Sequence, residues 1–85
     1  MLRPALVVIV ASLAAEMTTV DIIEAVNRQC LPHLNALPTP ANSYSWGAIL
    51  AELKRQGYRP TTVAVRGRDL YHKPVFINHP GFRKV

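Results

Sequence analysis

The sequence has little of three things that point to a definite chemistry: cysteine, acidic side chains and glycine. Its single cysteine, Cys30, excludes an intrachain disulfide, so a disulfide-stapled secreted scaffold is not indicated. Only five residues are acidic, which leaves few candidates for general acid–base catalysis. The sequence contains neither a glycine-rich phosphate-loop motif nor a serine nucleophile-elbow motif. We therefore expect a protein that is not an enzyme and uses no cofactor.

A long hydrophobic run is also missing. The longest uncharged apolar stretch, residues 4–15, is too short for a membrane-spanning helix, which needs about 20 residues. We expect no membrane association and a cytoplasmic protein. Three interpretations of the N-terminal segment 1–17 stay open: an extra buried helix with Pro4 in its first turn, an extension ahead of a natural start at Met17, or a short signal peptide in residues 1–15 that leads to export.

Positive charge is concentrated in the last third of the chain. Residues 53–85 carry eight lysines and arginines against Asp69 alone, a net charge of +7, whereas residues 1–52 sum to −2. With 85 residues, 49% of them hydrophobic, the chain has material for one packed domain. A cationic end on a small domain favours a polyanionic partner, because basic side chains that neutralise phosphates release condensed counterions.

Two helices are predicted from apolar periodicity. Residues 19–30 repeat apolar side chains at helical spacing behind Thr18 or Thr19 as the cap. Residues 44–56 form the clearer helix, with Asn42 or Ser43 as its cap and Gly57 at its end. The apolar face of this second helix consists of Trp46, Ile49, Leu50 and Leu53. Its outward face would then carry Tyr44, Ser45, Gly47, Ala48, Ala51, Lys54 and Arg55.

A connector and a hairpin complete the prediction. The connector 31–42 is rich in proline and asparagine, with a short helical turn at 33–37 as its one candidate element. Residues 61–66 alternate as a strand, and residues 67–69 are a plausible hairpin turn. Residues 70–77 return as the partner strand, which Pro74 places at a sheet edge or bends. Residues 78–81 end it.

The order of these elements resembles a winged helix-turn-helix. The residues that carry the resemblance are the runs 18–26 and 46–58, the Arg66-Gly67-Arg68 segment and a strand that ends near Pro80. They look like the small winged-helix domains attached to phage and plasmid replication proteins. The implied fold is α+β, with two or three helices and a two-stranded β-hairpin wing, over residues 18–80 and followed by a basic tail, 81–85. The connector departs from the short turn of the standard motif.

The resemblance implies a double-stranded DNA-binding protein of transcription regulation or replication in a bacterium, phage or plasmid. Helix 44–56 would be the recognition helix and 61–77 the wing. The chemistry of the exposed positions predicts the DNA contacts Ser45, Lys54, Arg55, Arg66, Arg68 and Lys73. The alternative is a winged helix that contacts proteins without touching DNA, for which the apolar N-terminal segment is the support. A homodimer or a larger assembly is compatible with either function.

A metal site is not predicted. Cys30 and His33 have ligand-like spacing, but His72 and His79 are six residues apart beside a strand and do not complete the pattern. Trp46 is expected in the core, because it falls on the apolar period of its helix.

Overall fold

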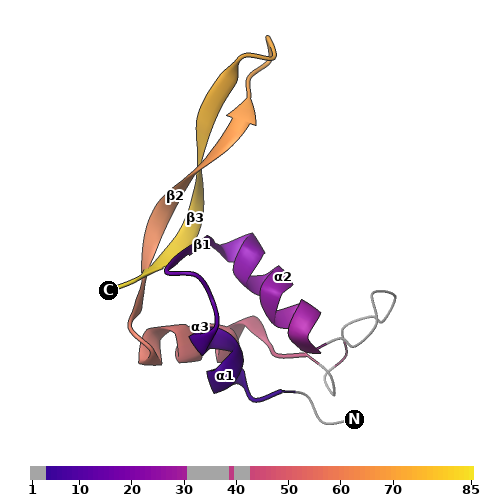
Figure 1. Ribbon diagram of the computed structural model, residues 1–85, viewed down its shortest axis with the longest axis vertical. Helices are drawn as coiled ribbons and strands as arrows, with labels where there is room; N and C mark the ends of the chain where they lie inside the picture. Colours follow the sequence, from indigo (N-terminus) through magenta and orange to yellow (C-terminus); the bar gives the residue numbers. More distant parts are fainter. Residues whose placement is uncertain (1–3, 31–38, 40–42) are drawn as a thin grey trace.

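The computed structural model describes residues 4–30, 39 and 43–85 as a small α+β domain (Figure 1). Among these residues, three helices and three strands follow one another in an order consistent with a winged helix-turn-helix. They are α1 (Leu6–Ala11), β1 (Glu16–Thr18), α2 (Thr19–Cys30), α3 (Trp46–Arg55), β2 (Tyr58–Arg68) and β3 (Pro74–Lys84). The predicted fold class is therefore confirmed.

The sheet is antiparallel in the order β1-β3-β2. Strands β2 and β3 pair without interruption from Tyr58 opposite Lys84 to Arg68 opposite Pro74. Strand β1 covers only the last residues of β3, from Glu16 opposite Arg83 to Thr18 opposite Gly81. Most of the hairpin consequently extends away from the helices as a two-stranded ribbon along the longest axis of the molecule (Figure 1).

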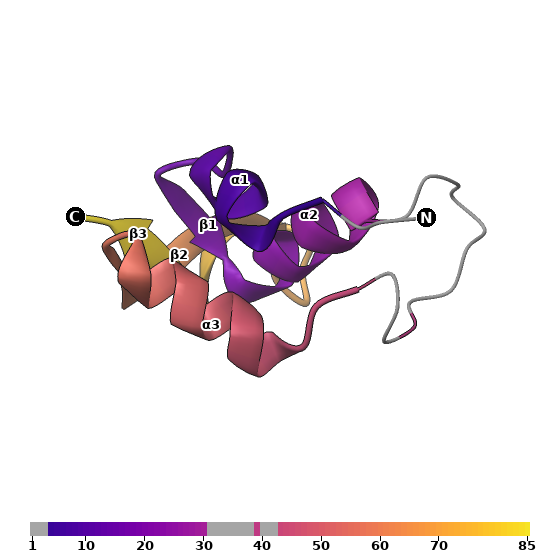
Figure 2. The ribbon, with the colours of Figure 1, turned by 90° about the horizontal axis from the view of Figure 1, so that it is seen from below.

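The helices lie together at the base of this ribbon. Seen from below, α3 runs along one side of the domain, with α1 and α2 on the other (Figure 2). The fully or nearly fully buried apolar residues come from every helix and from the base of the hairpin: Ile9, Val10, Ile22, Val26, Cys30, Ile49, Leu53, Tyr58 and Phe82. The core is thus a single cluster, and the outer part of the hairpin contributes nothing to it.

Helix α2 has the bounds predicted from its periodicity, and Thr18 is its cap. The Thr18 Oγ1 atom accepts a hydrogen bond from the backbone N–H of Asp21 at 3.1 Å. Helix α3 ends as predicted at Gly57, whose φ of +94° is the left-handed conformation that favours glycine.

The cap of α3 was assigned to the wrong residue. Ser45 caps the helix, and its Oγ accepts from the N–H of Ala48 at 3.3 Å. Ser43 instead donates its hydroxyl proton to the carbonyl oxygen of Thr39 at 2.6 Å. Asn42, the helical turn predicted at 33–37 and most of the connector lie outside the described residues.

The N-terminal segment forms part of the fold. Helix α1 buries Ile9 and Val10 completely, as the extra-helix interpretation expects. The segment is also bonded to distant strands: the Tyr58 hydroxyl donates to the carbonyl oxygen of Ala14 at 2.9 Å, and the Lys84 N–H donates to that of Ala15 at 2.7 Å. The elements of the fold therefore run from Leu6 to Lys84, beyond the predicted limits of 18–80 on both sides.

The hairpin is longer than predicted, and its turn lies elsewhere. Gly67 and Arg68 belong to β2, and the turn consists of residues 69–73, so the predicted return strand at 70–77 begins four residues too early. Residues 78–81 continue β3 instead of ending it. Pro74 is the first residue of β3, where its missing N–H is tolerated. There β3 pairs with β2 alone and forms a sheet edge, as predicted, whereas β1 makes β3 central only at residues 81–83.

Candidate nucleic-acid interface

The exposed face of α3 is built from small residues. Gly47, Ala48 and Ala51 are all exposed, as predicted, and a Cβ atom added at Gly47 would meet nothing within 4 Å. The Ser45 hydroxyl oxygen already serves as the helix cap, which leaves its proton available for donation. A flat face of this kind allows a phosphate or a base edge to approach the helix backbone closely.

The exposure of two aromatic residues at the start of α3 differs from the prediction. Tyr44, predicted to face outward, packs against the core, and its hydroxyl donates to the carbonyl oxygen of Pro4 at 2.6 Å. Trp46, predicted to be buried, keeps 36% of its surface exposed. Its ring lies 6.0 Å from that of Phe82, so the first turn of α3 sits at the rim of the core and the large indole is covered on one side only.

The C-terminal end of α3 presents Lys54 and Arg55 to solvent. Arg55 is engaged by Glu52, with Nε to Oε2 at 2.5 Å and Nη2 to Oε1 at 3.0 Å. The hydrogen bonds from Arg55 lower the pKa of Glu52, and the same bonds raise the pKa of the Arg55 guanidinium. Glu52 therefore stays ionised and offsets the charge of Arg55, which leaves Lys54 as the stronger candidate for a phosphate contact.

A basic junction surrounds the start of β2, and of its three cations only Lys54 was a predicted contact, whereas Arg59 and Lys84 were not. Arg59 and Lys84 are both exposed, and Lys84, which pairs with Tyr58, holds its Nζ 5.9 Å from the centre of the Tyr58 ring. Lys54, Arg59 and Tyr58 line a shallow depression of about 370 Å³ at this corner. Lys84 comes close to the start of β2 only through the register of the sheet, which pairs it with Tyr58. The sequence shows that this residue is charged, but it does not show where the residue lies in the fold.

The wing carries the other three predicted contacts. The unbroken register and the alternation of strand side chains put Arg66 and Arg68 on one face, with Phe76 directly opposite Arg66. Lys73 lies in the turn that follows and is exposed. All three cations belong to the part of the hairpin that extends beyond the core (Figure 1).

The structure brings these cations together in two groups. One is the basic junction of Lys54, Arg59 and Lys84; the other is the wing group of Arg66, Arg68 and Lys73. Arg66 lies eight residue steps along β2 from Tyr58, which corresponds to roughly 26 Å at about 3.3 Å per residue. A single continuous basic face is therefore absent from the described residues, and a polyanion would have to be long enough to reach both groups.

No protein-family model, curated protein or solved structure matches this chain. The resemblance to the winged-helix domains of phage and plasmid replication proteins accordingly stays a prediction, carried by the residues described above. What is established is the fold class, in which α3 precedes a long hairpin.

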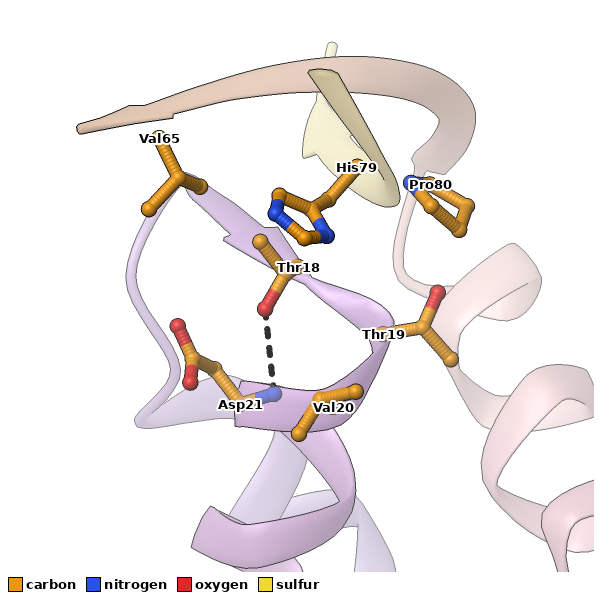
Figure 3. Close-up of a pocket in the computed structure, with 7 residues that line it drawn as sticks. All are labelled: Thr18, Thr19, Val20, Asp21, Val65, His79 and Pro80. Carbon is orange, nitrogen blue, oxygen red and sulfur yellow. Dashed lines mark hydrogen bonds between the residues drawn. The ribbon is translucent and has the colours of Figure 1, made fainter. Parts of the chain in front are cut away.

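A shallow pocket of about 260 Å³ lies between the start of α2 and the hairpin (Figure 3). His79, Pro80 and Val65 form its hairpin side, and Thr18 to Asp21 form its floor. The positive end of the α2 dipole is already opposed by the Asp21 carboxylate in the first turn, so the pocket has no obvious attraction for an anion.

The described residues contain no group of three or more His, Cys, Asp and Glu side chains able to hold a metal ion. Cys30 is buried, and His33 lies outside the described residues, so the spacing of this pair is not tested. In the part of the chain that the structure describes, no helix is long and apolar enough to cross a membrane.

Proposed function

We propose that this protein binds double-stranded DNA, with α3 as the recognition helix and the β2–β3 hairpin as the wing. The observation that carries the proposal is the hairpin, which extends beyond the core with Arg66, Arg68 and Lys73 exposed on it. A solubilising role for these cations would not require a projecting ribbon. DNA binding makes use of both the charge and the reach of the ribbon.

The two basic groups suit one duplex. The face of Gly47, Ala48 and Ala51 enters the major groove, where alanine methyl groups contact thymine methyl groups and the Ser45 hydroxyl donates to a phosphate. Lys54 contacts the backbone at the rim of that groove. The wing group then reaches the backbone or the minor groove roughly 26 Å away along the ribbon, which is less than the 34 Å or so of one helical turn.

The competing proposal, a winged helix that contacts proteins, loses its main support. It depended on an apolar N-terminal segment free to seek a partner, but the central residues Ile9 and Val10 of that segment are fully buried by α2, α3 and the sheet. The segment leaves Val7 and Val8 exposed, at 43% and 63%, and a pair of exposed valines is far smaller than an apolar patch that marks a protein interface. We place the DNA-binding function in transcription regulation or replication, following the resemblance.

Salt dependence tests the proposal. Fluorescence anisotropy with mixed-sequence duplex DNA should give an association constant that falls with salt, with a log–log slope near −4 for about four or five phosphate contacts. Two results contradict DNA binding: no association at about 50 mM salt, where counterion release is most favourable, or an affinity that does not change between about 50 and 200 mM.

A further inference from the structure

The end of the wing exposes two large apolar side chains next to each other. Leu70 is 95% exposed and Tyr71 is 81% exposed, at the point of the molecule farthest from the helices (Figure 1). Isolated exposed apolar residues are ordinary. Leu70 and Tyr71 differ from these because they are neighbours, are largely exposed and lie at the end of a hairpin that extends beyond the core.

The turn that carries them is held in one conformation. The Asp69 Oδ1 atom accepts hydrogen bonds from the N–H groups of Tyr71 at 2.8 Å and Lys73 at 2.9 Å. The Asp69 N–H donates to the Lys73 carbonyl oxygen at 3.1 Å, and Arg68 Nη1 donates to the carbonyl oxygen of His72 at 2.8 Å. Leu70 and Tyr71 are thus presented from a fixed backbone, and little ordering of the turn is needed when they bind.

Charge on both sides of the turn indicates the partner. Arg66 and Arg68 precede the apolar pair and Lys73 follows it, while Asp69 is the one acid of the hairpin. Because Asp69 Oδ1 accepts the turn's own N–H groups, part of its charge is directed inward. An apolar point flanked by cations matches the minor groove of DNA, where side chains such as leucine enter between base pairs while basic residues hold the phosphates.

We propose that Leu70 and Tyr71 form a wedge that enters the minor groove and partly unstacks one base step. This inference rests on the proposed DNA-binding function and adds to it a deformation of the duplex. A wedge must separate stacked bases, so a step that is already weakened costs less to open. DNA with a central mismatch should therefore bind more tightly than the matched duplex.

The experiment compares two duplexes of about 20 base pairs that are identical except for one central mismatch. Fluorescence anisotropy is measured for the unaltered chain, for a tip variant with Leu70→Ser and Tyr71→Ser, and for a control with Val8→Ser and Val20→Ser. The control removes two exposed apolar side chains from helices. Thermal unfolding should be unchanged in both variants, since all four side chains are largely in solvent.

The unaltered chain and the control should prefer the mismatched duplex by about tenfold, and the tip variant should bind both duplexes nearly equally. The tip variant should retain the salt slope, because it loses no cation. Equal binding of both duplexes by the unaltered chain, or an undiminished preference in the tip variant, overturns the wedge while DNA binding stands.

Two further results separate the wedge from its alternatives. Failure of the unaltered chain to bind either duplex at about 50 mM salt ends both the wedge and the proposed function. Sedimentation with vesicles of phosphatidylserine and phosphatidylcholine, lost only in the tip variant and without any mismatch preference, would assign the tip to lipid insertion and overturn the wedge.

Discussion

Single glycines show how closely the strands approach one another at the base of the hairpin. A Cβ atom added at Gly81 would lie 2.4 Å from the carbonyl oxygen of Met17 and 2.6 Å from Cγ2 of Val63. The first of these is a backbone atom of β1 and has no room to move. Gly81 was predicted to help end its strand. In the structure it lies within β3 and leaves room for β1 to pair there.

We expect Gly81→Ala to lower the free energy of unfolding by at least about 2 kcal/mol, because the added methyl group overpacks a backbone contact. Gly47→Ala provides the matched control. No atom lies within 4 Å of its added Cβ, so this change should be neutral or stabilise α3 by up to about 1 kcal/mol. Urea unfolding of both variants measures the difference, and equal stabilities would show that β1 does not lie against Gly81.

At the scale of elements, α3 contains a charge pair that bears on the proposed DNA binding. Glu52 engages Arg55 through two hydrogen bonds on the helix that we propose for recognition. We expect Glu52→Gln to release Arg55 for a phosphate contact and to tighten DNA binding about threefold at about 100 mM salt, with a salt slope steeper by up to about 1. Anisotropy titrations at several salt concentrations measure both effects.

The control for this prediction is Glu24→Gln on α2, which removes the same charge from another exposed position. It should change binding less, because its effect is limited to the net charge of the molecule. An equal gain from the two substitutions would indicate that α3 has no special position relative to the DNA.

Elements that are fixed by interactions between residues close in the sequence were predicted well, and elements fixed by residues far apart in the sequence were not. Helix α2 and the end of α3 depend on local signals, apolar spacing and a capping residue or a glycine, and both were predicted from these. Strand β1 has three residues and exists because it pairs with β3 more than sixty positions away, so no local pattern reveals it. The hairpin turn was misplaced because Gly67 resembles a turn residue. In the structure the chain reverses at Asp69, whose side-chain Oδ1 accepts hydrogen bonds from the N–H groups of Tyr71 and Lys73.

The candidate site was predicted in part for the same reason. The exposed small face of α3 follows from the helical period, and Arg66 follows from the alternation of the strand, whereas Arg68 was predicted in the turn and lies in β2. The basic junction could not be found in this way, since Lys84 reaches Tyr58 only through the full register of the hairpin. The half-exposed position of Trp46 also depends on where Phe82 lies across the sheet.

The whole molecule is elongated, with extents of 47 × 33 × 18 Å. This shape places the cations of the hairpin far from those at the end of α3. A duplex held by α3 alone would contact one basic group, whereas a duplex that also reaches the wing gains Arg66, Arg68 and Lys73. Because neither arginine contributes to the core, removing both should change binding without unfolding the protein.

We expect Arg66→Ala combined with Arg68→Ala to weaken DNA binding by about tenfold at about 100 mM salt and to make the log–log salt slope less steep by about 2, one unit for each lost phosphate contact. The midpoint of thermal unfolding should stay within a few degrees, because both side chains are exposed. Arg3→Ala with Arg28→Ala removes the same charge from residues outside α3 and the hairpin, so it should lower affinity only slightly. If the two double variants lose affinity and slope equally, the wing makes no direct contact and the duplex is attracted by net charge alone.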